Sequence, residues 1–419
     1  MKRHTAARAL AAGAFAASAA LVLGGCGQGF DDGGGGGGDA ADGELTSSDE
    51  SLTLLFGSSG DAETDAVNEA VAAWSEESGV EVEVTAATDQ AQQLSQGFAG
   101  GDPPDLFYLA PELLAGYADN GSLLAYGDML ENKADFYPAL VESFTYDDQF
   151  YCAPEDFSSL ALIINKGLWD AAGLTEDDIP TTWDELATVA QTLRKDGVVG
   201  LGFGWEWQRL GTFMAQAGGG LVEDGEVIAN SQENVDALTY VQDQMNAGSF
   251  AYAQDLGSGW GGEAFGKQQT AMTIEGNWIA GAMNNDYPDV EYIVAELPEG
   301  PAGKGTLVFT NCWGMAADSP NQQAALDLVE HLTSPEQQLA LAQAIGVMPS
   351  VQSTGDQWRE ENPDSAGFIA GVDYAQGIPT YDGTSDVIAD FNSELQGLKT
   401  GDPQEILDSV QSNLEAIVG

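Results

Sequence analysis

The sequence is poor in the side chains that most catalytic and metal sites need. Its 419 residues include two histidines and three cysteines, and His331 is the only histidine after residue 25. Histidine-based catalysis and His/Cys zinc sites are therefore nearly excluded by inventory. No Walker-type phosphate loop and no calcium-loop spacing is present. The match to Gly-x-Gly-x-x-Gly at Gly257–Gly262 has no strand–turn–helix context, so we expect no metal and no cofactor.

Positive charge is also scarce. The chain has 12 Lys+Arg against 67 Asp+Glu, a net charge of −55. The first 25 residues hold three basic and no acidic residues, so the charge of the chain without them is −58. Nucleic acids and anionic lipids are recognised by cationic surfaces, and this composition argues against both as partners. A neutral or a cationic ligand remains compatible.

Long apolar runs are missing except near the N-terminus. Ala9–Leu23 is an apolar run of 15 residues that follows Lys2, Arg3 and Arg8. The run is too short for a comfortable membrane span. Basic residues, a short apolar run and small residues in this order predict a signal peptide over residues 1–25.

The end of this signal resembles the lipobox of bacterial lipoproteins. "LGGC" ends at Cys26, which would be lipidated and would anchor the protein at the membrane. A plain signal peptide with a chance cysteine is the alternative. Residues 26–50 are rich in Gly, Asp and Ser and predict a flexible tether.

The remaining length exceeds one ordinary core and favours two domains. Predicted strands and helices alternate in its first part: Ser51–Gly57, Asp61–Gly79, Val80–Ala86, Asp89–Gly101 and Pro104–Ala110. Such alternation predicts a parallel sheet covered by helices. Later helix starts are indicated by Thr182 with Glu185, and by Ser319, Ser334 and Asp402, each before a proline.

Five stretches in a fixed order carry a resemblance to a known family. They are "GDPPDLFYL" (Gly101–Leu109), Asp147–Leu174, "PTTWDELATVAQTL" (Pro180–Leu193), "FGKQQTAMTIEGNW" (Phe265–Trp278) and Trp313–Gln338. Over residues 50–419 the chain resembles the extracellular solute-binding proteins of carbohydrate-uptake ABC transporters, the family that includes maltose-binding protein.

The resemblance implies an α/β, two-lobed, periplasmic-binding-protein-like fold of type II. One lobe would comprise residues 50–156 and 311–360, and the other residues 157–310 and 361–419. A hinge would join them, and the lobes would close around a ligand in the cleft between them. The implied function is that of a monomeric binding component of an ABC importer and not of an enzyme. It would capture a neutral mono- or oligosaccharide at the extracellular face of the membrane and deliver it to the permease.

The resemblance also implies a disulfide. Cys152 and Cys312 would flank the strands that cross between the lobes, on one sheet. Disulfides persist outside the cell. Two buried thiols that act as small apolar side chains are the alternative.

A sugar cleft needs flat aromatic faces beside polar acceptors and donors, because sugars present apolar faces and hydroxyl rims. Five of the nine tryptophans stand beside glycines or at predicted strand ends: Trp205, Trp207, Trp260, Trp278 and Trp313. Core packing is the alternative for each. The family's Gly-x-Trp favours Trp278 as a ligand platform.

Polar candidates complete the predicted site. Glu206 lies between two tryptophans and would grip a sugar. The others come from loops at strand ends: Ser58, Ser59, Asp61, Tyr108, Asp156, Asn277 and Tyr381. Ser58 and Ser59 also suit helix capping, and Asn277 suits a plain turn.

Three other functions fit parts of the sequence. A cationic solute such as a polyamine would suit the acidity. A secreted glycoside hydrolase would need two carboxylates about 5–10 Å apart across a cleft, and no pair stands out. A lipoprotein that acts in adhesion or sensing is the third.

Overall fold

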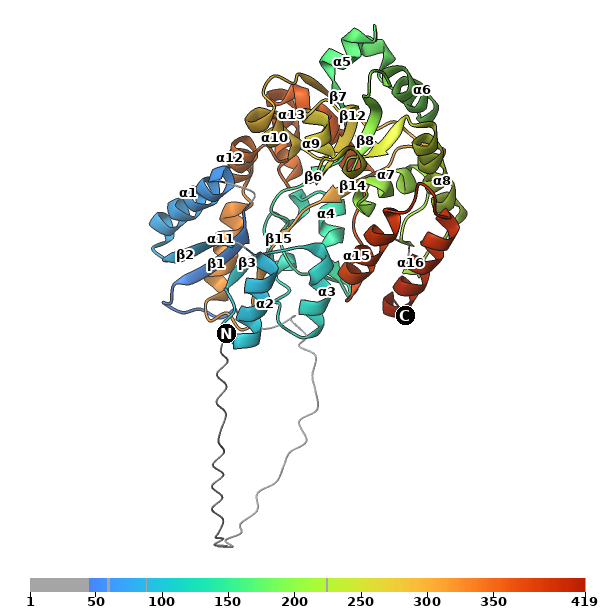
Figure 1. The fold of residues 1–419 in the computed structure, drawn as a ribbon. Helices are drawn as coiled ribbons and strands as arrows, with labels where there is room; N and C mark the ends of the chain where they lie inside the picture. Colours follow the sequence, from blue (N-terminus) through green and yellow to red (C-terminus); the bar gives the residue numbers. More distant parts are fainter. Residues whose placement is uncertain (1–44, 59–60, 88, 224, 419) are drawn as a thin grey trace, which may run out of the picture. The chain divides into compact units, whose positions relative to one another are not determined.

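The computed structural model describes residues 45–58, 61–87, 89–223 and 225–418. All of them belong to one compact unit, Ala40–Gly419 (Figure 1). The predicted signal peptide, Cys26 and Ser59 lie outside the described residues, as does the side chain of Asp61. Within the described part, every helix is too short or too polar to span a bilayer.

The first sheet has four strands in the order β15-β3-β1-β2. Its strands are β1 (Leu52–Gly57), β2 (Val82–Ala87), β3 (Leu106–Leu109) and β15 (Cys312–Met315). β1 is parallel to β2 and β3, because helices α1 (Asp61–Ser78) and α2 (Gln90–Gly100) connect them. This confirms the predicted alternation. β15 pairs antiparallel with β3 from a distant part of the sequence.

The second sheet has five strands in the order β11-β8-β12-β7-β13. Its strands are β7 (Ala161–Asn165), β8 (Val199–Phe203), β11 (Phe250–Tyr252), β12 (Thr270–Glu275) and β13 (Tyr292–Ala295). β7, β8 and β12 are almost wholly buried, which agrees with a sheet whose two faces are both covered.

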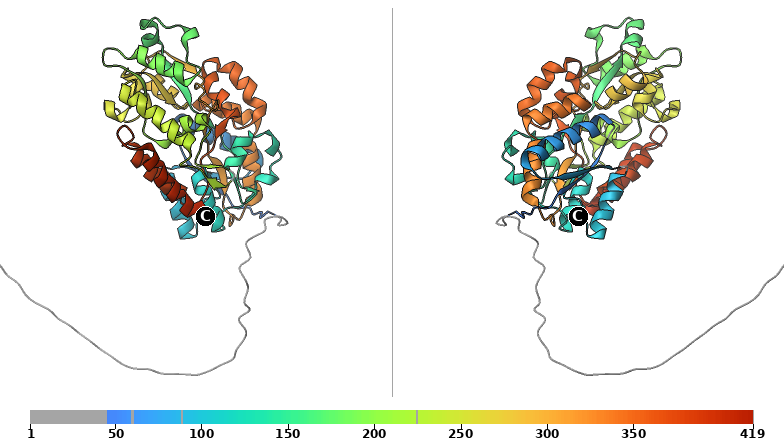
Figure 2. Two further views of the ribbon diagram at one scale, coloured as in Figure 1. Left: turned by 90° about the vertical axis from the view of Figure 1, so that its right-hand side faces the viewer. Right: turned by 90° about the vertical axis from the view of Figure 1, so that its left-hand side faces the viewer.

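Helices from three parts of the chain surround this sheet: α6 (Trp183–Leu193), α7 (Trp207–Ala217), α8 (Gln232–Ala247), α9 (Gly261–Gly266), α15 (Thr384–Leu395) and α16 (Pro403–Val418). The two views of Figure 2 show the C-terminal helices α15 and α16 beside α7 and α8. Their apolar faces share one core cluster with the second sheet.

Three short strands form a small sheet where the chain crosses between the two larger ones. Its order is β16-β14-β6, with β6 (Ser158–Ser159), β14 (Thr306–Phe309) and β16 (Ala375–Gln376). β6 leads into β7, and β14 leads from the second sheet into β15 of the first. We call these three the crossing strands; β6 and β14 are labelled between the larger sheets in Figure 1.

The remaining helices and hairpins cover the edges. They are α3 (Pro111–Asp119), α4 (Pro138–Ser143), α5 (Lys166–Ala171), α10 (Ile279–Asp286), α11 (Gln322–Leu332), α12 (Pro335–Ile345), α13 (Gly355–Glu361), α14 (Ala366–Ile369), β4 (Thr145–Tyr146), β5 (Gln149–Phe150), β9 (Val222–Glu223) and β10 (Glu226–Val227).

Each large sheet takes its strands from the segments that the resemblance assigns to one lobe. A third core cluster, however, packs residues of both predicted lobes together, among them Tyr137, Ile279 and Trp358. The lobe boundaries therefore stay a prediction.

A disulfide ties the crossing region to the first sheet. Cys152 and Cys312 are buried and bonded, with their Cα atoms 5.6 Å apart and 160 positions between them in the sequence. Cys312 begins β15, and Pro154 forms a bridge with it. The bond thus joins two crossings of the chain at the edge of the first sheet.

Candidate ligand-binding site

Trp278 stands where β12 ends. The strand stops at Glu275, Gly276 and Asn277 turn the chain, and α10 begins at Ile279. Trp278 is 38% exposed, whereas most other large apolar side chains are buried. A methyl group on Gly276 would lie 2.2 Å from the Trp278 ring, so the turn requires a glycine.

A buried ion pair holds the Trp278 ring. One oxygen of Glu275, Oε2, accepts hydrogen bonds from Trp278 Nε1 (3.0 Å) and from Arg209 Nη2 (2.6 Å). The Arg209 guanidinium lies over the ring, 5.3 Å from its centroid, and Phe309 meets it edge-on at 5.4 Å. Burial raises the pKa of Glu275, and Arg209 opposes that rise. The ring is thus oriented by three neighbours while part of it remains open.

Trp278 forms a wall of a cavity of about 540 Å³, which we call the Trp278 cavity. The described lining comes from the end of β1, from α1, from the crossing strands and from α10 and α12. It comprises Gly57, Glu63, Glu155, Asp156, Ser158, Asn277, Gly281, Ala282, Asn285, Asp286, Phe309, Thr310, Asn311, Ile345 and Val347. The cavity therefore lies beside the crossing strands, with groups from both large sheets around it.

Carboxylates dominate the polar part of the lining. Glu155 is 3% exposed; its Oε1 accepts from Asn311 Nδ2 (3.3 Å), and its Oε2 has no hydrogen-bond partner. Burial, then Asp156 and Glu63, raise the pKa of Glu155 well above its ordinary value. Burial and Glu63 raise the pKa of Asp156 to about 7. Among the described lining residues there is no lysine, arginine or histidine.

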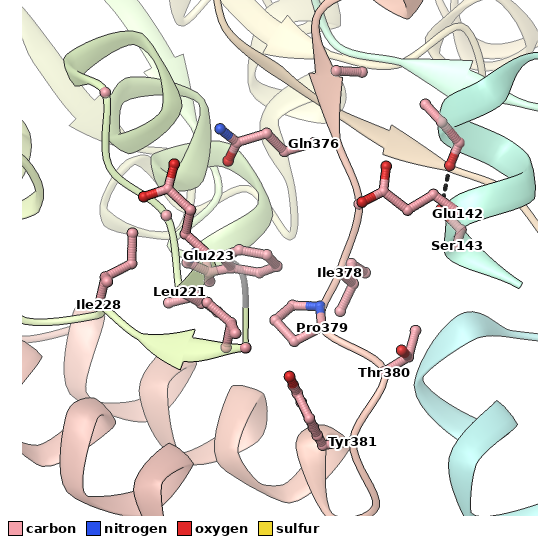
Figure 3. Close-up of a pocket in the computed structure, with 18 residues that line it drawn as sticks. Glu142, Ser143, Leu221, Glu223, Ile228, Gln376, Ile378, Pro379, Thr380 and Tyr381 are labelled. Atoms are coloured by element: carbon pink, nitrogen blue, oxygen red, sulfur yellow. Dashed lines mark hydrogen bonds between the residues drawn. The ribbon is translucent and has the colours of Figure 1, made fainter. Parts of the chain in front are cut away.

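A second cavity of about 510 Å³ lies at the other edge of the crossing strands (Figure 3). It is lined by Ala375 and Gln376 of β16, whereas the Trp278 cavity is lined by Ser158 of β6. Tyr381, Pro379 and Gln376 approach it from one segment, and Leu221 and Glu223 from the opposite side. We call it the Tyr381 cavity.

The structure divides the predicted binding residues. Asp156, Asn277 and Trp278 line the Trp278 cavity, and Trp207 and Tyr381 line the Tyr381 cavity. Asn277 is buried, and its Nδ2 donates to the Gly346 carbonyl (2.8 Å), so its amide also ties the β12 end to the end of α12.

Two predicted ligand contacts need correction. Tyr108 and Trp313 are 1% exposed and face each other across β3 and β15, with ring centroids 4.6 Å apart. Both are core side chains, because they lie in strands of the first sheet and belong to its buried core cluster. Tyr108 still donates to Oε1 of Glu63 (3.3 Å), which lines the Trp278 cavity.

Other candidates lie outside both cavities. Trp205 meets Tyr252 edge-on at 6.4 Å, and Trp260 precedes α9 and packs on the third core cluster. Glu206 stands at the N-cap position of α7. Ser58 accepts a hydrogen bond from Thr64 Oγ1 in the first turns of α1 (2.7 Å). Their contact with a ligand stays a prediction.

Several polar groups of the Trp278 cavity were not predicted from the sequence, among them Glu63, Glu155 and Asn311. Glu155 directly precedes Asp156, and Asn311 directly precedes Cys312. Glu155 and Asn311 could have been predicted because both are polar residues beside the segments that cross between the predicted lobes. Glu63 had no such signal, because it reads as an ordinary helix residue.

Comparisons with known proteins agree with this architecture. A family model described as "Bacterial extracellular solute-binding protein" matches residues 69–365. A binding protein of Brucella abortus is 22% identical over 345 residues, covering 78% of this chain and 82% of that protein. The diacetylchitobiose binding protein DasA of Streptomyces coelicolor is 26% identical over 274 residues, covering 62% of this chain and 64% of that protein.

Among solved structures, the cyclic α-maltosyl-1,6-maltose binding protein of Arthrobacter globiformis superposes with a TM-score of 0.77. It is 23% identical, and the match covers 88% of this chain and 98% of that one. This similarity confirms the predicted fold class, two α/β lobes with a cleft between them.

Proposed function

Because the chain belongs to the bacterial extracellular solute-binding proteins, we propose that it is the substrate-binding component of an ABC importer and captures a mono- or oligosaccharide outside the cell. The observation that supports this most directly is the half-open Trp278 ring beside buried carboxylates. A pyranose would stack its C–H face on the ring, and its hydroxyls would donate to Asp156 and Glu155.

The names of two relatives support a saccharide ligand. DasA is named for diacetylchitobiose, and the Arthrobacter globiformis protein for a cyclic maltosyl-maltose. A sugar has both the flat face and the hydroxyl rim that this cavity matches, whereas a polyamine has no flat face. We therefore infer a saccharide in preference to a polyamine, and binding without turnover in preference to hydrolysis.

Delivery to the membrane is the second part of the proposal. The Trp278 cavity takes groups from both large sheets, so closure about the crossing strands would enclose a bound sugar. A ligand drives closure only if it binds the closed form better than the open one. The permease would then receive the closed form, with the protein held at the outer face of the membrane through Cys26.

Thermal unfolding with a saccharide panel tests the proposal. A ligand at 100 times its dissociation constant stabilises the folded state by about 2.7 kcal/mol, which is readily measured. Glucose, maltose, cellobiose, diacetylchitobiose and their longer oligomers form the panel, and spermidine represents the polyamines. A shift with spermidine and with no carbohydrate would reject the proposed function.

A further inference from the structure

We propose that the saccharide carries a protonated amino group, which Glu155 binds at the Trp278 cavity together with Glu63 and Asp156. This inference rests on the proposed function and names the class of sugar within it: an amino sugar, or an oligosaccharide that contains an amine.

The first argument is a missing donor. Glu155 is 97% buried, Asn311 supplies one hydrogen bond to Oε1, and Oε2 has none. A buried carboxylate oxygen without a donor is costly, and a donor from a ligand would remove that cost. The side chain contributes to the lining, so a bound ligand can reach it.

The second argument is the charge of the lining. Glu63, Glu155, Asp156 and Asp286 line the cavity, and its described lining contains no cationic side chain. The nearby Arg209 is already paired with Glu275 at 2.6 Å. A neutral hydroxyl would satisfy the hydrogen bond of Glu155 but would leave the carboxyls protonated or, once they ionise, without a counter-charge. An ammonium group would supply both the donor and the charge, in a charge-assisted hydrogen bond.

Titration of the pair supports the same conclusion. Burial, then Asp156 and Glu63, raise the pKa of Glu155, and burial and Glu63 raise the pKa of Asp156 to about 7. In the ligand-free protein these carboxyls therefore hold protons near neutral pH. A bound cation within about 4–6 Å would favour the ionised carboxylates and would displace those protons.

The third argument selects a sugar among the possible cations. Trp278 offers an aromatic face fixed by Glu275, Arg209 and Phe309. A metal ion would leave this face unused, and a flexible polyamine would cover it poorly. An amino sugar matches the aromatic face with its ring and the carboxylates with its amine.

Matched saccharides test the inference on the full-length protein. Each set keeps one skeleton and changes hydroxyl to amine to acetamide: glucose, glucosamine and N-acetylglucosamine, then cellobiose, glucosaminyl-glucosamine and diacetylchitobiose. Calorimetric titration at about pH 7 should give an amine member that binds at least tenfold tighter than its hydroxyl counterpart. Added salt should narrow that difference.

Variants of the carboxylates identify which side chains cause the preference for the amine member. Glu155→Gln should weaken binding of the amine member much more than binding of the hydroxyl member, and so remove most of the preference for the amine. Asp156→Asn should reduce the same preference. Glu233→Gln, an exposed carboxylate in the first turn of α8, removes one charge elsewhere and should change nothing.

Each other outcome has a distinct meaning. If the hydroxyl or acetamide member binds as tightly as the amine, the inference fails and the proposed function stands. If no saccharide binds, both fail. If calcium chloride alone stabilises the protein and Glu155→Gln abolishes that effect, the carboxylates hold a metal and the inference is wrong.

Discussion

At the residue scale, the environment of Trp278 depends on one buried carboxylate. Glu275 accepts hydrogen bonds from Trp278 and Arg209 on the same oxygen, so the indole is oriented by a polar contact. The Trp278 ring packs edge-on against Phe309, and 38% of the Trp278 side chain remains exposed. An aromatic side chain held in this way loses little freedom when a ligand stacks on it.

Trp278→Ala should weaken saccharide binding about 10- to 100-fold, because the stacking face is lost. The ligand-free melting temperature should change by only a few degrees, since the side chain is partly exposed and lies at a turn. Titration and differential scanning calorimetry measure the two effects, with Trp278→Phe as the control that keeps a smaller ring. Extensive unfolding of the alanine variant would show that Trp278 is core.

Asp156 should make the ligand-free protein less stable as the pH rises. Its pKa is raised to about 7 by burial and by Glu63, against an ordinary value near 3.9 in the unfolded chain. The folded state thus binds a proton more tightly, and this contribution to stability is lost between about pH 4 and pH 7. Asp156→Asn should therefore raise the free energy of unfolding at pH 8 by at least about 1 kcal/mol, because a tenfold change in proton affinity corresponds to about 1.4 kcal/mol.

Urea denaturation at pH 4 and pH 8 measures this difference. At pH 4 the variant and the parent should agree, because Asp156 is then protonated in the folded state. Burial also raises the pKa of Glu155 itself, so Glu155→Gln should change the stability at pH 8 with the same sign. An equal effect of Asp156→Asn at both pH values would reject the assignment.

At the element scale, a single ion pair connects a strand end to a helix. Glu275 ends β12, Arg209 lies in the first turn of α7, and both are largely buried. Removing one partner of such a pair costs about 3–5 kcal/mol, since the other charge is left alone. Glu275→Gln should therefore destabilise the protein by a few kcal/mol.

The double variant Arg209→Met/Glu275→Gln separates the contribution of the ion pair to stability from the cost of leaving one charge unpaired. It should recover part of the stability, because no unpaired charge remains. Both variants should also bind ligand more weakly, as Trp278 loses its acceptor or its covering guanidinium. Additive destabilisation in the double variant would show that the two side chains do not act together.

The observed helix N-caps show which helix starts can be predicted from the local sequence alone. Thr182 and Ser334 cap α6 and α12, accepting from the Glu185 and Gln337 amides as predicted. Ser319 does not cap its helix: α11 begins at Gln322, and Ser319 donates instead to Asp105 Oδ1 (2.6 Å). Ser319 bonds a residue distant in the sequence, and the N-cap moves two residues along the chain, from Ser319 to Asn321.

At the scale of the whole molecule, the Cys152–Cys312 disulfide joins segments separated by 160 positions. A bond that closes such a long loop restricts the unfolded chain, and its removal should cost about 2–5 kcal/mol. Cys152→Ser/Cys312→Ser should therefore lower the urea midpoint, and reducing agent should lower that of the parent similarly. Peptide mapping without reduction should find the two cysteines linked; two free thiols would contradict the structure.

The sequence by itself determined the class of this protein. Alternating strands and helices and five ordered motifs determined the α/β fold, because these are local patterns that persist in the folded state. The Gly-x-Trp motif that ends at Trp278 indicated a binding surface. The scarcity of histidine and cysteine argued against a catalytic site.

Only the tertiary structure decided which residues share a cavity. Trp278, Glu63, Glu155 and Asn311 come from four distant segments that meet at the crossing strands. Trp313 and Tyr108 turn inward, although the sequence placed them, like Trp278, at predicted strand ends. The physical reason is that burial depends on what covers a strand end. That covering comes from parts of the chain up to hundreds of residues away, so no local pattern records it.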